Sequence, residues 1–238
     1  MIQRSAAVGT AAGGCRKGRE DGTEAVRCLP DAVRAAGVKA VRSIIKKRVE
    51  TEADMEIACI SHKETVSARD ILADFLKSFA AVTKYGRTVI YEGEDYYLPY
   101  YLFTCQIEET GERYGFLAGV LCEDISVFKM GADADIEDSL REVPEACVLQ
   151  GEKKREAVRE EISRKIKLNK RLRKMSMRYH MRELSLEMVY LREKAFYVKG
   201  KSTYLFLVDD FLRKVDFKHL EAVEKRFVEN CRLQADAV

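Results

Sequence analysis

The sequence predicts an α+β fold made of two α-β-β units, in each of which a helix packs on an antiparallel hairpin. A disordered N-terminal tail precedes the units and a C-terminal helix follows them. Apolar residues recur at helical spacing in two separate segments. Two runs rich in aromatic and β-branched residues follow each segment, and a glycine-containing turn separates the runs, which is typical of a hairpin. Neither hairpin is stable alone, so each requires its helix.

The composition is that of a folded protein without a membrane-spanning helix. The chain has 238 residues, of which 47% are hydrophobic and 34% are charged, with three prolines and no tryptophan. This apolar content exceeds that of disordered chains and can fill a sizeable core. No uninterrupted apolar run reaches the roughly 18 residues that a spanning helix needs, so we expect no membrane partner.

The cysteines indicate a reducing compartment. They are odd in number, irregularly spaced and form no CxxC pair: Cys15, Cys28, Cys59, Cys105, Cys122, Cys147 and Cys231. Several lie in apolar runs, as reduced core cysteines of cytosolic proteins do. Because no apolar signal segment follows Met1, we expect a cytoplasmic protein.

Residues 1–54 are predicted to be a disordered or partly helical basic tail. They are rich in alanine, glycine and arginine and show no sustained period. The glycines at 9–14 lack the spacing of a phosphate-binding loop and follow no strand. Because ordered patterning begins near Met55, that residue is an alternative natural start.

The first unit is predicted over residues 55–150 and begins with a short strand and a helix. Ser61 and Glu64 fit a capping box that opens the helix over 62–84. Apolar residues recur on one face of this helix: Ala68, Ile71, Leu72, Phe75, Leu76, Phe79 and Ala80. Gly86 ends it.

A hairpin follows this helix. Strands are predicted at 88–91 and 96–107, a turn at 108–112, and a returning strand at 114–122. The segment 126–149 after the hairpin is mixed and acidic. Its carboxylates could surround Ca²⁺, but the glycine and terminal glutamate of an EF-hand are missing, so we expect a solvated acidic loop: Asp133, Asp135, Glu137 and Asp138.

The second unit is predicted over residues 151–238. A basic helix at 153–184 leads to strands at 186–191 and 195–198, a turn, and a returning strand at 203–208. Asp216 can cap a last helix whose apolar side holds four residues: Leu220, Val223, Phe227 and Cys231.

Two returning strands carry a resemblance to a known family. They read TYLFLVDDFLRKV at 203–215 and RYGFLAGV at 113–120. With their preceding helices they resemble tandem PepSY-type α-β-β modules, in which the last strand ends in an Asp-containing turn. Arg213 stands where that family usually has a glycine. The modules are generally secreted or membrane-tethered, and the resemblance implies a small binding module without chemistry of its own.

Charge is distributed unevenly although the net charge is only +3. Residues 51–150 hold 8 basic and 20 acidic side chains, whereas residues 151–182 hold 13 and 4. We favour mutual neutralisation of these segments in the fold, and the alternative is a basic face for a polyanion. The candidate polyanion-binding residues are Arg164, Lys167, Lys170, Arg171, Lys174 and Arg178. No helix-turn-helix, zinc-finger or RNP-type pattern accompanies them.

A tyrosine-rich stretch is the candidate partner-binding site. Alternation along a strand sends about half of its side chains outward. If Tyr97, Tyr100 and Tyr101 were exposed at an edge, they would suit a protein partner.

No catalytic, cofactor or metal site is predicted. Cys59 and His62 have CxxH spacing, but His180 and His219 lie far away in the sequence. Two pairs of adjacent carboxylates follow returning strands and are better suited to turns and caps than to acid–base catalysis: Glu123 with Asp124, and Asp209 with Asp210.

The sequence therefore favours a non-enzymatic binding or assembly protein that acts through a sheet face or edge. Its partner would be another protein or a second copy of the chain. The alternative is a nucleic-acid-associated protein that uses the basic helix, and no cofactor is expected in either case.

Overall fold

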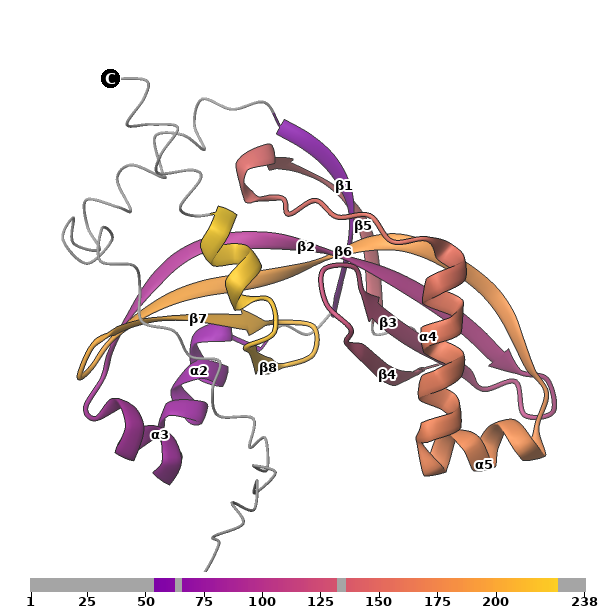
Figure 1. Cartoon of the computed structure of the whole chain (residues 1–238). Coiled ribbons are helices and arrows are strands. Elements are labelled where there is room, and N and C mark those ends of the chain that lie inside the picture. Colours follow the sequence, from indigo (N-terminus) through magenta and orange to yellow (C-terminus); the bar gives the residue numbers. More distant parts are fainter. Residues whose placement is uncertain (1–53, 63–65, 132–135, 227–238) are drawn as a thin grey trace, which may run out of the picture.

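The chain is an α+β protein, as a computed structural model shows, and its described residues form an eight-stranded sheet (Figure 1). The structure describes residues 54–62, 66–131 and 136–226. The predicted basic tail lies outside these residues except for Asp54, as do Phe227 and Cys231 of the predicted last helix. No helix among the described residues is long and apolar enough to cross a membrane.

Two long strands form the centre of the sheet. β2 (Val89–Ile107) and β6 (Met181–Lys199) pair antiparallel along nearly their whole length. On the β2 side follow β3 (Arg113–Gly119) and β4 (Ile125–Met130), and on the β6 side follow β7 (Thr203–Asp209) and β8 (Lys214–Asp216). β1 (Asp54–His62) meets β6 at one parallel bridge and pairs along its length with β5 (Ile136–Pro144).

The predicted hairpins are confirmed, but the strands are longer than the sequence suggested. The segments 88–91 and 96–107 join into β2, whose register with β6 shifts between Glu92 and Asp95. Gly93 lies at this irregularity, where a β-carbon would come within 2.9 Å of the Tyr197 ring and 3.0 Å of the Ala195 carbonyl. The absence of a side chain thus allows the strand to continue.

The acidic segment 126–149 is largely regular structure, and the solvated loop predicted at 133–138 is wrong at its C-terminal end. Most of that segment forms β4, β5 and a short 3-10 helix, η1 (Glu145–Cys147). Asp133 and Asp135 lie outside the described residues, while Glu137 and Asp138 belong to β5. The acidic residues hid the strands because they mask the apolar alternation on which strand prediction depends.

The first predicted helix is two helices, and its start was wrong. Ser61 and His62 belong to β1, and Ser67 is the N-cap residue of α2 (Ala68–Leu76). α3 (Phe79–Tyr85) follows, capped by Ser78, whose hydroxyl oxygen accepts from the Ala81 N–H at 3.3 Å. Gly86 ends α3 with φ +75°, as predicted.

The basic helix is also broken into two. α4 (Arg155–Leu168) ends at Asn169, and α5 (Lys170–Arg178) begins directly after it. The Asn169 side-chain oxygen accepts from the N–H groups of Arg171 and Leu172, so this residue caps the second helix instead of continuing the first. The predicted helical residues from 181 to 184 belong to β6.

The core lies on both faces of the central strands. Val189, Leu191 and Tyr197 of β6 are buried with the C-terminal segment, including Leu220 and Val223; we call this cluster the central core. Other β6 residues pack under α2 and α3, or against α4 and α5. In Figure 1 the two helix pairs cover opposite ends of the sheet.

Candidate functional site

The six predicted polyanion-binding residues form part of an exposed basic surface on α4 and α5. All six side chains are exposed: Arg164, Lys167, Lys170, Arg171, Lys174 and Arg178. The helices are held by their apolar sides, because Val158, Ile162 and Leu172 are buried in a cluster with β2, β3 and β6. This leaves the cations on the outer side.

Most of these cations are not neutralised by the acidic segment. Three cations of the region have carboxylate partners: Lys153 with Glu161, Arg159 with Glu183, and Arg164 with Glu123 at 3.8 Å. Among the described residues, no carboxylate lies within ion-pair distance of Lys167, Lys170, Arg171, Lys174 or Arg178. The mutual neutralisation that the sequence favoured is therefore not observed for these five residues.

Within α5 the cations share a face. Arg171, Lys174 and Arg178 are three and four residues apart, so they lie in one row along the helix. Two apolar side chains stand beside the cations, Leu168 at 79% exposure and Met177 at 81%. A hollow of about 500 Å³ on the outside of α4 adjoins this surface.

The predicted tyrosine surface is not formed. Tyr97, Tyr100 and Tyr101 are only 9%, 2% and 6% exposed. β2 lies in the middle of the sheet and both of its faces are covered, so its outward side chains are buried as well as its inward ones. Tyr101 packs against α4 and donates a hydrogen bond to the Lys153 carbonyl at 3.0 Å.

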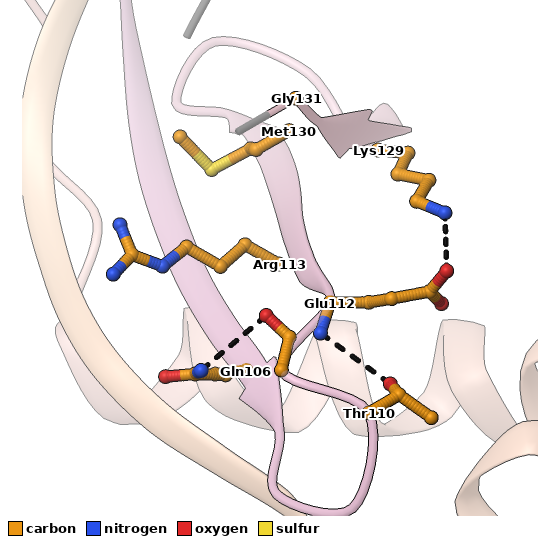
Figure 2. A pocket seen from close by; sticks show the side chains of 8 residues that line it. Gln106, Thr110, Glu112, Arg113, Lys129, Met130 and Gly131 are labelled. Carbon is orange, nitrogen blue, oxygen red and sulfur yellow. Dashed lines mark hydrogen bonds and ion pairs between the residues drawn. The ribbon is translucent and has the colours of Figure 1, made fainter. Parts of the chain in front are cut away.

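A second hollow, of about 480 Å³, lies at the turn between β2 and β3 (Figure 2). Its polar side chains are largely engaged with one another. Gln106 Nε2 donates to the Gly111 carbonyl, and Lys129 pairs with Glu112. These contacts stabilise the hairpin end and leave Arg113 as the cation that faces the hollow without a partner among the described residues.

A buried polar cluster lies in the central core, where the sequence predicted none. Its members are almost fully inaccessible: Glu193 (0% exposed), Asp209 (0%), Asp216 (2%) and His219 (1%). Glu193 on β6 and Asp209 on β7 are direct cross-strand partners. Asp216 ends β8, and His219 directly precedes the helical turn at 220–226.

The cluster is organised around the His219 ring. Nδ1 lies 2.9 Å from Asp216 Oδ2, 3.5 Å from Glu193 Oε1 and 3.4 Å from the Tyr100 hydroxyl. Nε2 lies 3.1 Å from Cys122 Sγ on the other side of the ring. Asp216 Oδ1 accepts the Lys218 and His219 N–H groups, which precede the helix that begins at Leu220. The sequence predicted Asp216 as the cap of the last helix, but it holds the turn before that helix and does not cap the helix itself.

Burial shifts the pKa values of these groups. It raises the pKa of Glu193 to about 8 and that of Asp209 to about 6, because an apolar core disfavours a carboxylate. Burial also opposes ionisation of Asp216 and His219. Their mutual hydrogen bond and opposite charges outweigh it, so the pKa of Asp216 is lowered and that of His219 is raised.

The sequence contains one signal that could have located this cluster. Val189, Leu191, Ala195 and Tyr197 alternate along β6 on one side, and Glu193 occupies the central position of that apolar series. A charged side chain is almost never fully buried at such a position unless it is paired or coordinates a metal. Its partners could not be found in the same way, because they come from separate segments.

The remaining candidates have structural roles. Asp209 Oδ1 accepts the Leu212 N–H at 2.8 Å, and Asp210 pairs with Arg192. Asp124 pairs with two lysines, Lys214 and Lys218. Among the described cysteines, Cys59, Cys105 and Cys147 are buried and Cys122 is half-buried, and none of the four forms a disulfide bond.

Comparison of the chain with protein-family models, with curated proteins and with solved structures found no match. The resemblance to PepSY-type modules therefore stays a prediction.

Proposed function

We propose that the protein binds nucleic acid through the basic surface of α4 and α5. The observation that carries the proposal is the row of exposed cations on these helices, five of which have no carboxylate partner among the described residues. A row of unneutralised lysine and arginine side chains attracts a phosphate backbone and releases its counterions.

Two further features support this function. The basic surface belongs to helices that pack firmly on the sheet through Val158, Ile162 and Leu172, so it presents its charges on a stable support. No side chain pattern for reading base edges accompanies it, so binding is independent of sequence and depends strongly on salt.

The test is fluorescence anisotropy with labelled single- and double-stranded nucleic acid over a range of salt concentrations. The variant replaces Lys170, Arg171, Lys174 and Arg178 by glutamine. Each duplex phosphate contact contributes about 0.9 to the slope of log K against log salt. We expect the variant to bind more weakly and to lower that slope by up to about 3 to 4.

A matched variant controls for total charge. Glutamine at four exposed cations around α3 and the adjoining strand ends removes the same charge at the other end of the sheet: Lys77, Lys84, Arg87 and Lys199. We expect this variant to bind almost as the unmodified protein does. Equal losses in the two variants, or no binding at low salt, would contradict the proposal. Binding to anionic vesicles but not to nucleic acid would assign the surface to lipid phosphates instead.

A second candidate function is association with a protein, or with a second copy of the chain, through the edge of β5. β5 pairs only with β1 among the described strands, and Leu140 on it is 70% exposed. An open strand edge with an exposed apolar side chain can add a further strand. Light scattering tests self-association through this edge. We expect the unmodified protein to have an apparent mass above that of a monomer, and Leu140→Lys to lower it. A monomeric unmodified protein would argue against self-association.

We further infer that the chain consists of two α-β-β units, residues 55–150 and 151–238, which complete one another's sheet. The matching lengths support this: β2 and β6 have 19 residues each, and β3 and β7 have 7 each. Each long strand follows a pair of helices and precedes its hairpin partner.

A further inference from the structure

We propose that Glu193, Asp216 and His219 bind a divalent transition-metal ion in the central core. One ligand atom from each residue lies within 4.8 Å of the others. Ligands of one tetrahedral zinc ion, with bonds of about 2.0–2.2 Å, lie roughly 3.3 to 3.6 Å apart. The three side chains therefore need only small adjustments to surround one ion.

Glu193 supplies the observation that calls for a cation. Its side chain is fully buried, and neither of its carboxylate oxygens has a hydrogen-bond partner among the described residues. The nearest cationic group is the His219 ring, whose Nδ1 lies at the ion-pair distance of 3.5 Å from Oε1. Asp209, its direct cross-strand partner, also has one buried oxygen, Oδ2, without a hydrogen bond. Buried carboxylates facing one another require a positive charge or a proton between them.

The other two ligands are already oriented. Asp216 Oδ1 is held by two backbone N–H groups, which leaves Oδ2 directed at His219 Nδ1 at 2.9 Å. With the ion at Nδ1, the Nε2–H of His219 donates to Cys122 Sγ at 3.1 Å. A hydrogen bond from the distal nitrogen of a ligating histidine is the usual way in which proteins fix the ring.

The ligand types indicate the class of ion. An imidazole nitrogen with carboxylate oxygens suits Zn²⁺, Mn²⁺ or Fe²⁺ better than Mg²⁺ or Ca²⁺, which prefer oxygen alone. Because all three ligands are buried, the ion would enter as the chain folds, and its binding would stabilise the native state.

The test loads the full chain by refolding it from urea with Zn²⁺ and measures retained metal after exhaustive dialysis. Glu193→Gln keeps the shape of the side chain and removes its buried charge, so this variant is expected to fold without metal. We expect the unmodified protein to retain about one ion per chain more than the variant. Zinc should also raise the thermal midpoint of the unmodified protein relative to chelator, and should leave that of the variant unchanged.

Asp210→Asn is the matched control, because Asp210 is the neighbouring carboxylate and pairs with Arg192 outside the cluster. This variant should retain zinc as the unmodified protein does. Comparing variants removes the contribution of any other zinc-binding groups of the chain. Equal retention by the unmodified protein and Glu193→Gln, or a thermal midpoint that does not respond to zinc, would overturn the proposal and leave the cluster held by protons.

Discussion

His180 is an exposed histidine whose charge is stabilised chiefly by Glu109. Its Nδ1 lies 2.9 Å from Glu109 Oε1, and its backbone N–H donates to the same carboxylate. The side-chain hydrogen bond and the charge of Glu109 raise the pKa of His180 above 6.5, while the His180 hydrogen bonds lower the pKa of Glu109 below 4.5. The pair therefore stabilises the fold fully between about pH 4.5 and 6.5.

The sign of each shift sets how this stabilisation is lost. It disappears as pH rises through the raised pKa of His180, and as pH falls through the lowered pKa of Glu109. NMR titration of the histidine ring, assigned with His180→Gln, should give a pKa above the ordinary value. In Glu109→Gln that pKa should return towards 6.5; an unchanged value would show that Glu109 is not the cause.

Gly200 is required by a close backbone approach. A β-carbon at this position would lie 2.3 Å from the Tyr85 carbonyl oxygen, to which the Lys201 N–H donates. Gly200→Ala must displace the end of α3 or the β6–β7 turn, and we expect a loss of about 1–3 kcal/mol in urea unfolding. Lys199→Ala, at an exposed neighbouring position, should change stability by less than about 0.5 kcal/mol.

At the residue scale, the exposed charged side chains could be predicted from the sequence, and the buried charged side chains could not. The cations of α4 and α5 were identifiable because a dense run of lysine and arginine is solvated in almost any fold. Glu193, Asp216 and His219 were not, because the β6–β7–β8 pairing that brings them together is a property of the sheet. Tyr100 was misplaced for the same reason, since nothing local shows that β2 is central.

At the element scale, Asn169 decides the shape of the basic surface. It is extended, at φ −81° and ψ 117°, and its side chain caps α5. Asn169→Ala removes two hydrogen bonds to helix N–H groups, and we expect it to cost about 0.5–2 kcal/mol of stability. Asn169→Asp and Asn169→Ser keep a capping oxygen and should cost less, so an equal loss in all three variants would contradict the capping role.

Helix breaks of this kind explain why two predicted helices are each divided in the structure. Periodicity identified the helical segments 62–84 and 153–184, but each contains a capping residue, Ser78 or Asn169, that divides it. An apolar period of 3.6 continues across such a break, so it cannot reveal one. The start of the first helix was predicted at Ser61, whereas Ser67 is its N-cap residue. Both serines are followed by residues that are compatible with a helix N-terminus.

At the scale of the whole molecule, the two proposed units share one ladder of strand pairing. β2 and β6 are paired from Val89–Lys199 to Ile107–Met181, and Leu98 and Leu191, both fully buried, face each other near its middle. The sequence left open whether the proposed units share one sheet, because pairing between strands about 90 residues apart leaves no local signature. Separating the units would expose long apolar edges on both.

This dependence predicts the behaviour of a chain cut between the units. A protease site inserted between Gln150 and Gly151 falls outside the helices and strands, so the uncut variant should fold normally. After cleavage, the two pieces should stay together in size-exclusion chromatography, because the β2–β6 ladder and the central core join them. Each piece isolated in urea and returned to buffer alone should lack cooperative unfolding, whereas mixing them should restore it. Pieces that elute apart, each with cooperative unfolding of its own, would show that the units are independent domains.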